Sequence, residues 1–297
     1  MKKGLLLLLF LVLIPIASLA ETVVTSFYPI WLFTLNLTDG IDGLEVRNLA
    51  APDTGCLHDY QLQTGDMKVL ATADLFVVNG AGMESYLDLV FESFPDLPVA
   101  QAAAGLPLLY DNSAIQIGEK EEEGLPNAHV WLSVPNASHM VDQIAAALTA
   151  RFPQYADAIE ANRAAYVSRL ASLDERMREM LSGLPRRGIV TFHEAFPYFA
   201  EAYGFQVLAV VNREPGETLS PAQLAALVDV IRNLGLPPLF VEPQYEDLSA
   251  RTLAAETGAR VYTLDPVVTG PENEVPLDYY ETVMLKNAET LTVALGE

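Results

Sequence analysis

Short apolar runs alternate with stretches of helical periodicity along most of this chain. We expect strands in the apolar runs, at residues 22–27, 44–49, 75–79, 130–133, 188–192, 205–211, 239–242 and 260–264. We expect helices in the stretches between them, at residues 28–37, 64–71, 135–151, 195–203, 221–234, 249–257 and 277–295. This alternation is typical of βα units and of a mainly parallel sheet.

Residues 153–184 form a different kind of segment. Charged residues occur throughout it, apolar residues recur at helical spacing, and neither Pro nor Gly interrupts it from Gln154 to Ser182. The apolar stripe has one gap, at Asn162 and Arg163. At 1.5 Å per residue this helix would be about 45 Å long, which is enough to cross a whole two-lobed protein.

The expected fold class is therefore α/β, with two βα lobes of mainly parallel sheet joined by one long backbone helix. We place the N-terminal lobe at residues 21–152, the linking helix at 153–184 and the C-terminal lobe at 185–297. A ligand site would then lie in the cleft between the lobes.

The first twenty residues have the pattern of a targeting segment. A short basic start at Lys2 and Lys3 precedes an uncharged, mostly aliphatic run that ends at Ala20. Small residues stand where a signal peptidase requires them, and polar residues follow. We expect residues 1–20 to be a secretory signal peptide, with an uncleaved membrane anchor as the alternative. The mature protein should then work in the periplasm or elsewhere outside the cytoplasm.

Composition excludes several classes of function. The chain has 17 Lys and Arg against 39 Asp and Glu, a formal net charge of −22. Nucleic-acid binding depends on basic residues that neutralise phosphates, so we expect no nucleic-acid partner. The only cysteine, Cys56, excludes an intrachain disulfide framework and a multi-cysteine zinc site. The acidic run at 119–123 is typical of solvated surface.

Three of the four histidines fall beside predicted strands. His58 follows the second predicted strand, His129 directly precedes the run 130–133, and His193 directly follows the run 188–192. Asp265 adds a carboxylate after another predicted strand. Ligand sites in open α/β sheets gather at strand ends. Three imidazoles and one carboxylate make a plausible four-coordinate zinc shell.

The order of these residues along the chain suggests where the metal lies. His58 and His129 come before the long helix, whereas His193 and Asp265 come after it. A cation held by all four would bridge the two lobes. A single histidine at a strand end is more often a hydrogen-bonded structural residue, so the hypothesis depends on the set. His139, near the start of a predicted helix, is expected to be solvated or to cap that helix.

Each of three further residues, Cys56, Asp59 and Glu242, allows two interpretations. Cys56 is two residues from His58, so both side chains can point the same way from an extended segment, although a small buried thiol is the favoured interpretation. Asp59 could accept a hydrogen bond from His58 or face solvent. Glu242 could orient a ligand or bind a helix N-terminus.

Motifs typical of enzymes are missing from the sequence. His193-Glu194 begins like a zinc-protease helix, but Pro197 stands where the second histidine is required. The sequence has no Gly-x-Ser-x-Gly elbow, no Walker loop and no dinucleotide-type glycine fingerprint. Four protein ligands would also leave no position for a catalytic water. We therefore expect a binding or transport protein and no enzyme.

Several motifs together resemble a known family, the metal-binding solute-binding proteins of bacterial ABC transporters for zinc and manganese, often called ZnuA-like or TroA-like. The similarity covers nearly the whole mature chain. The motifs that carry it are His58-Asp59-Tyr60-Gln61-Leu62, Ala73-Asp74-Leu75, Asn79-Gly80, His129-Val130-Trp131-Leu132, Thr191-Phe192-His193, Ala195-Phe196, Tyr198-Phe199, Glu242-Pro243-Gln244, Glu256-Thr257-Gly258-Ala259 and Leu264-Asp265-Pro266.

The resemblance implies a metal in the interlobe cleft, with His58, His129, His193 and Asp265 as its ligands. It implies a monomer that delivers zinc to the membrane permease of an ABC importer. Manganese-type members tend to carry Glu at the third ligand position. His193 stands there in this chain, so the resemblance favours Zn²⁺, with Mn²⁺ as the alternative. Imidazole ligands also suit zinc better than manganese.

The sequence also departs from the family pattern. Leu57 and Ala128 precede the first two ligand histidines, where the family commonly has Pro, and the acidic run 119–123 lacks the histidines of many zinc members. Other functions stay open beside the zinc importer. These are a manganese-binding member of the family, a binder of an organic metal chelate, a secreted zinc hydrolase and a secondary role as an adhesin.

Overall fold

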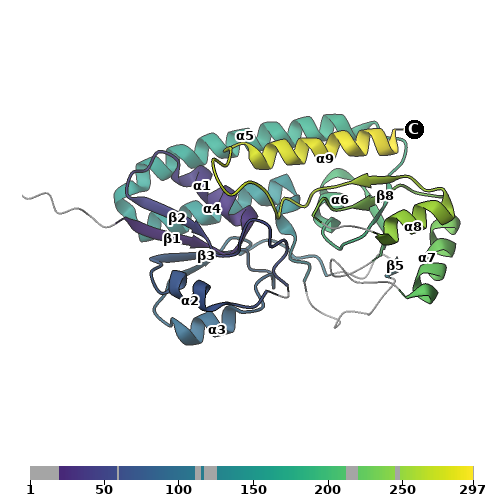
Figure 1. Ribbon diagram of the computed structural model, residues 1–297. Coiled ribbons are helices and arrows are strands. Elements are labelled where there is room, and N and C mark those ends of the chain that lie inside the picture. Colours follow the sequence, from purple (N-terminus) through teal and green to yellow (C-terminus); the bar gives the residue numbers. More distant parts are fainter. Residues whose placement is uncertain are drawn as a thin grey trace, which may run out of the picture.

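The protein is described by a computed structural model that covers residues 20–58, 60–110, 115–116, 126–211, 220–244 and 248–296. Two parallel sheets with flanking helices form two lobes (Figure 1), which is the expected α/β architecture. Most of the expected signal peptide (residues 1–19), Asp59 and the acidic run 119–123 lie outside the described residues.

The N-terminal lobe is built on a four-stranded parallel sheet with the order β2-β1-β3-β4. The strands are β1 (Glu21–Thr25), β2 (Leu44–Asn48), β3 (Leu75–Val78) and β4 (Val99–Gln101). The helices between them are α1 (Tyr28–Thr38), α2 (Thr64–Leu70) and α3 (Leu87–Ser93). β3 is buried at every position, as an apolar run in a central parallel strand should be.

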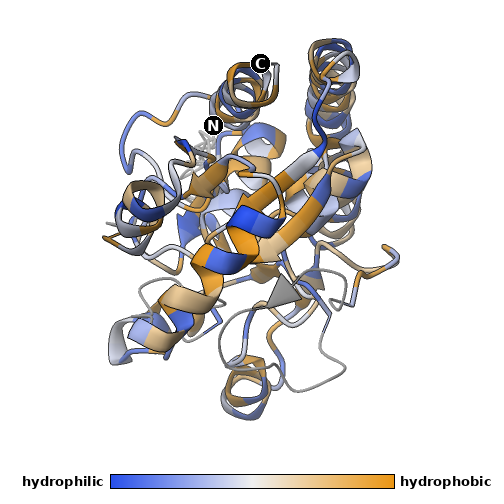
Figure 2. Ribbon diagram, turned by 90° about the vertical axis from the view of Figure 1, so that its right-hand side faces the viewer, coloured by the Kyte–Doolittle hydropathy of each residue, from blue (hydrophilic) through white to orange (hydrophobic). Residues whose placement is uncertain are grey.

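The C-terminal lobe holds a five-stranded parallel sheet with the order β5-β7-β6-β8-β9. The strands are β5 (Ile115–Gln116), β6 (Gly188–Thr191), β7 (Gln206–Val210), β8 (Leu239–Val241) and β9 (Val261–Thr263). The helices of this lobe are α6 (Pro197–Tyr203), α7 (Pro221–Asn233) and α8 (Leu248–Thr257). Figure 2 shows mostly hydrophobic strands at the centre of this lobe and mixed hydropathy on the surrounding helices.

Three longer helices connect the lobes. α4 (Val134–Arg151) leads through a 3₁₀ turn (η2, Pro153–Tyr155) into α5 (Ala156–Ser182). α5 runs side by side with the C-terminal helix α9 (Tyr279–Leu295) along both lobes (Figure 1). With 27 residues α5 is about 40 Å long. It packs against α1, α4, α6 and α9, so both lobes share one support.

The gap in the apolar stripe of α5 has a structural reason. Asn162 Nδ2 donates hydrogen bonds to the carbonyl oxygens of Leu37 (3.1 Å) and Asp39 (2.9 Å) at the end of α1. These carbonyls have no partner within their own helix. Asn162 therefore caps α1 instead of filling the core.

The prediction of one strand is wrong. Residues 130–133 do not form a strand; Val130–Leu132 forms a 3₁₀ helix (η1), with the Leu132 N–H donating to the His129 carbonyl oxygen and the Ser133 N–H to the Val130 carbonyl oxygen. All three residues of η1 are fully buried. A continuous apolar run has no polar positions that distinguish a period of two from a helical period. The sequence reasoning also missed α3, β4 and β5.

Among the helices of the described residues, none has both the length and the apolar composition that a membrane span requires.

Candidate metal centre

The strand order of the C-terminal lobe brings three site residues to one sheet edge. His193 follows β6, Glu242 directly follows β8, and Asp265 follows β9. These three strands are parallel neighbours in the sheet, so their carboxyl ends meet at the same edge. This edge faces the N-terminal lobe, because His193 and His129 are in contact across the interface.

His193 is held by a buried carboxylate. Its side chain is 3% exposed, and the Nδ1–H donates a 2.7 Å hydrogen bond to Glu242 Oε1. The second carboxylate oxygen of Glu242 accepts a 2.6 Å hydrogen bond from Gln244 Nε2. This pairing fixes the tautomer and the ring orientation, so Nε2 is the nitrogen that can bind a metal.

His129 is held in the same way by an amide. Asn127 Oδ1 accepts hydrogen bonds from the backbone N–H of His129 (2.9 Å) and from its Nδ1–H (3.2 Å). The amide is oriented in turn because Asn127 Nδ2 donates to the Glu194 carbonyl oxygen at 2.8 Å. His129 therefore presents Nε2 to the site, and one of its supports comes from the opposite lobe.

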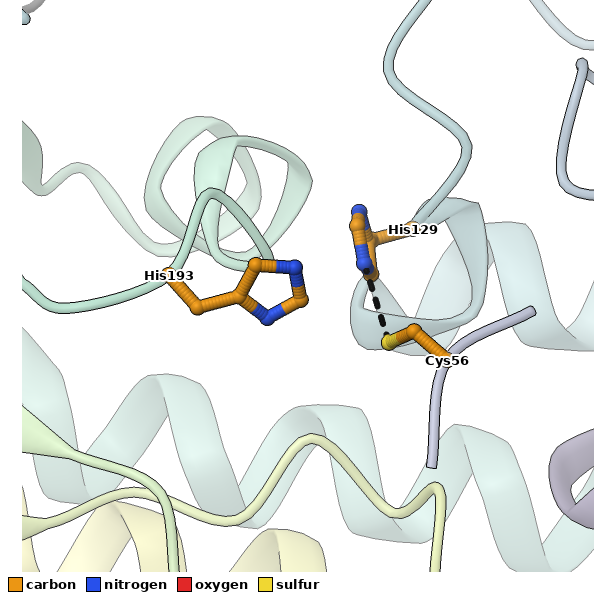
Figure 3. Close-up of side chains that lie close together, drawn as sticks. All are labelled: Cys56, His129 and His193. Atoms are coloured by element: carbon orange, nitrogen blue, oxygen red, sulfur yellow. Dashed lines mark hydrogen bonds between the residues drawn. The ribbon is translucent and has the colours of Figure 1, made fainter. Parts of the chain in front are cut away.

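The two buried histidines face each other across the interface, and Cys56 lies beside them (Figure 3). The ring centroids of His129 and His193 are 4.8 Å apart, and His129 Nε2 lies 3.4 Å from Cys56 Sγ. One ligand atom from each of these three residues lies within 4.8 Å of the other two. This is the distance range over which side chains share one metal ion.

The structure places the other two expected ligands near this cluster without bringing them into it. The ring of His58 lies 5.3 Å from the ring of His129, and the side chain is half-buried. Asp265 is also partly buried, and its Oδ1 accepts a 2.8 Å hydrogen bond from the backbone N–H of Val267. Among the described residues, neither belongs to the set whose ligand atoms lie within 4.8 Å. The full four-ligand set therefore stays a prediction.

Backbone strain accompanies the position of Asp265. Val267 is fully buried and has φ of 62°. A β-branched residue in this left-handed region is a genuine outlier, and such outliers cluster at functional sites. The conformation aims the Val267 N–H at the Asp265 carboxylate. The backbone N–H and C=O of Asp265 both bind the side-chain amide of Asn287, which ties the segment to α9.

Burial sets the protonation of two site residues. Desolvation, with the neighbouring charges of His193 and His58, holds the pKa of His129 well below its usual value. His129 is therefore a neutral imidazole, the form that binds a metal. Desolvation, together with the negative charge of Glu242, raises the pKa of Asp265 from 3.8 to about 6. A cation beside Asp265 and Glu242 would offset the repulsion between these two carboxylates.

Trp131 joins the two lobes next to the site. Its indole Nε1–H donates a 2.8 Å hydrogen bond to the Pro266 carbonyl oxygen, and the Tyr280 hydroxyl donates a 2.6 Å hydrogen bond to the Trp131 carbonyl oxygen. The Trp131 ring is fully buried, with its centroid 5.2 Å from that of His129. The side chain thus fixes the spacing between the His129 loop and the Asp265 loop.

The sequence reasoning missed a second support of the His129 loop. Buried Glu84 accepts hydrogen bonds from the backbone N–H groups of Asn79 (2.7 Å) and Gly80 (3.0 Å) at the end of β3. Asn79 Nδ2 in turn donates to the Ala128 carbonyl oxygen at 3.0 Å. Desolvation raises the pKa of Glu84 to about 7. A lone acidic residue in the apolar stretch after β3 was the signal that could have revealed it.

We expect Glu242→Ala to weaken zinc binding by roughly 10- to 100-fold, the range measured when hydrogen-bond partners of metal ligands are removed. The substitution frees the His193 ring to rotate and removes a negative charge beside the cation. Glu256→Ala is the matched control, because Glu256 is exposed on α8 of the same lobe. Equal zinc affinities for the two variants, measured by chelator competition, would contradict the role given to Glu242.

Comparisons with known proteins match this arrangement over nearly the whole chain. The model of the ZnuA family, described as the periplasmic component A of a zinc-uptake complex, matches residues 23–294. The iron-binding protein YfeA of Yersinia pestis is 29% identical over 297 residues, covering 96% of this chain and 93% of that protein. The zinc-binding protein AdcA of Streptococcus pyogenes is 31% identical over 286 residues, covering 91% of this chain. The chain spans only 55% of the length of AdcA.

A solved structure shows the same architecture. FpvC of Pseudomonas aeruginosa, in complex with Mn²⁺, superposes with a TM-score of 0.81 at 27% identity, covering 93% of this chain and 98% of that one. The names of these similar proteins refer to iron, zinc and manganese. Similarity alone therefore does not identify the metal. Its identity has to be inferred from the side chains at the site.

Proposed function

The chain belongs to the ZnuA family of zinc-uptake components, and we propose that it is an extracytoplasmic zinc-binding protein that delivers Zn²⁺ to the permease of an ABC importer. One observation supports this most strongly. A nearly fully buried histidine from each lobe, His129 and His193, presents its Nε2 side to the same interlobe space, with each Nδ1–H held by a polar partner. Oriented, neutral imidazoles are typical of zinc sites.

The proposed ligands are His58, His129, His193 and Asp265. Imidazole suits zinc, whereas manganese prefers carboxylates and water, so this set favours zinc. Family members are metal-transport binding proteins, and we propose that this chain is likewise no enzyme. A shell closed by four protein side chains would leave no position for a catalytic water.

The remaining parts of the proposal concern the whole protein. We propose that residues 1–20 direct it out of the cytoplasm, that it works as a monomer, and that it binds no nucleic acid. The net charge of −22 supports the last point, because there is little basic surface to neutralise phosphates.

A metal competition experiment tests the proposal. The purified protein, stripped with a chelator, is offered zinc and manganese together at equal concentrations, and bound metal is counted by elemental analysis. We expect one tightly held zinc per chain with manganese excluded. Preferential retention of manganese would assign the protein to the manganese branch of the family. Absence of any tightly bound metal would favour an organic chelate as the ligand.

Zinc affinity should also fall as the pH drops through about 6, where Asp265 gains a proton. A ligand must lose its proton before it binds a metal, so below this pH zinc has to displace the proton of Asp265. His129 contributes little in this range because burial keeps it neutral. Asp265→Asn should bind zinc more weakly throughout but with a flatter pH dependence. An unchanged affinity of the wild-type protein from neutral to mildly acidic pH would contradict this prediction.

A further inference from the structure

Cys56 meets the geometric requirements of a metal ligand better than two of the four residues proposed above. Its Sγ lies 3.4 Å from His129 Nε2, and it belongs with His129 and His193 to the set within 4.8 Å. Zinc bonds of about 2.3 Å to sulfur and 2.0–2.1 Å to nitrogen, at the tetrahedral angle, place those two donors about 3.5 Å apart. The observed separation already matches a shared zinc ion.

The backbone around Cys56 explains why its side chain points into the site. Leu57 is completely buried in the core of the N-terminal lobe. The side chains on either side of Leu57, those of Cys56 and His58, both approach His129. The backbone turns at His58, where the Tyr60 N–H donates a hydrogen bond to the Leu57 carbonyl oxygen.

Cys56 lies at the edge of the hydrophobic core, where it packs against core residues and also borders two buried imidazoles. Cys56 is only half-buried, and the groups beside it are two imidazoles whose outer nitrogens are held by Asn127 and Glu242. Both rings therefore turn their metal-binding edges toward the space that the sulfur borders (Figure 3). A metal ion shared by these three residues would account for their convergence.

We propose that Cys56 Sγ is a direct zinc ligand, together with His129 and His193, and that it makes the site selective for zinc over manganese. The proposal rests on the proposed function, since it concerns the same site. On binding, the thiol proton is released to water and the thiolate bonds to the metal. Thiolates favour zinc over manganese because they are soft donors. A shell of four then has one position left, so this proposal revises the ligand set given above and keeps only one of His58 and Asp265 in it.

X-ray absorption at the zinc edge tests this directly on the purified wild-type protein loaded with one equivalent of zinc under reducing conditions. We expect one sulfur at about 2.3 Å beside nitrogen and oxygen donors at shorter distances. Cys56 is the only cysteine in the chain, so Cys56→Ser should remove this sulfur signal while zinc remains bound through the histidines. A shell of nitrogen and oxygen alone in the wild-type protein would overturn the proposal.

Affinities provide the second measurement. Cys56→Ser and Cys56→Ala should both lose roughly tenfold or more in zinc affinity. Removing a direct ligand should weaken metal binding at least as much as removing a residue that only hydrogen-bonds to a ligand. Their affinity for manganese should change much less. His139→Ala is the control, because His139 binds the Ala104 carbonyl oxygen away from the site. A denaturant titration of the metal-free variants, compared with that of the wild-type protein, shows whether the variants are folded.

The outcomes separate the two proposals. Tight zinc binding without a sulfur ligand, or with Cys56→Ser matching the wild-type affinity, refutes the role of Cys56 and leaves the zinc-binding function intact. Failure of the wild-type protein to bind zinc tightly refutes the proposed function itself, and the role of Cys56 with it.

Discussion

Zinc affinity should fall by at least roughly 100-fold when His193 is replaced by alanine. The loss of a direct ligand should weaken zinc binding at least as much as the loss of a hydrogen-bond partner of a ligand. His193 is the buried histidine that the C-terminal lobe contributes, and its ring contacts that of His129 from the other lobe. Without it, the lobes no longer share the cation through two imidazoles. Competition with a chromophoric chelator measures the loss.

Two further variants sharpen this test. His139→Ala removes a histidine that binds the Ala104 carbonyl oxygen and is not among the proposed ligands, so this variant should keep the wild-type affinity. His193→Glu supplies a carboxylate, the kind of ligand that manganese prefers, so it should bind zinc better than His193→Ala and shift the preference toward manganese. Full zinc affinity in His193→Ala would refute the site.

Trp131→Ala should lower the free energy of unfolding of the metal-free protein by about 3–5 kcal/mol, the usual cost of truncating a buried aromatic residue to alanine. The side chain is fully buried, packs edge-on against Phe27, and donates a hydrogen bond to the Pro266 carbonyl oxygen. Truncation leaves a cavity and a carbonyl oxygen without this donor at the lobe interface. Denaturant titration without metal measures the effect, because bound zinc would itself stabilise the fold.

The chain offers a matched control for this variant. Trp31, the other tryptophan, is only partly buried on α1, so Trp31→Ala should cost clearly less. Trp131→Phe keeps most of the apolar volume and loses the N–H donor, so its stability should fall between those of Trp131→Ala and the wild type. An equal loss for Trp131→Ala and Trp31→Ala would show that the lobe interface has no special dependence on Trp131.

Much of the architecture could be predicted from the periodicity of the sequence. The apolar stripe of α5 is buried at Ile159, Tyr166, Leu170 and Leu173, as its helical spacing requires. The elements α3, β4 and β5 were not predicted, although others as short, such as α2 and β8, were. In α3 only Val90 is buried, and β4 has no fully buried position, so neither shows a clear apolar pattern. The burial of Val130–Leu132 on all sides likewise concealed a 3₁₀ turn.

The candidate site, too, could be predicted from the sequence only in part. A strand-end position was correctly predicted for His193, whereas the strand expected after His129 is a 3₁₀ helix; the structure nevertheless brings the two rings into contact. The position of Cys56 depends on Leu57 anchoring its loop, which sequence spacing alone cannot reveal. Asn127 is oriented by a hydrogen bond to the Glu194 carbonyl oxygen, and Glu84 supports the His129 loop through the bond from Asn79 to the Ala128 carbonyl oxygen. Both of these bonds join segments far apart in the chain, so sequence spacing does not reveal them.

The central claim is that one zinc ion lies between the lobes, held by His129 and His193. A crystal structure of the zinc-loaded protein, with anomalous diffraction measured at the zinc edge, tests it most directly. We predict one anomalous peak between the two rings, about 2.0–2.1 Å from the Nε2 atom of each. A peak elsewhere, such as at the acidic run 119–123, with neither ring in contact with the metal, would contradict the claim.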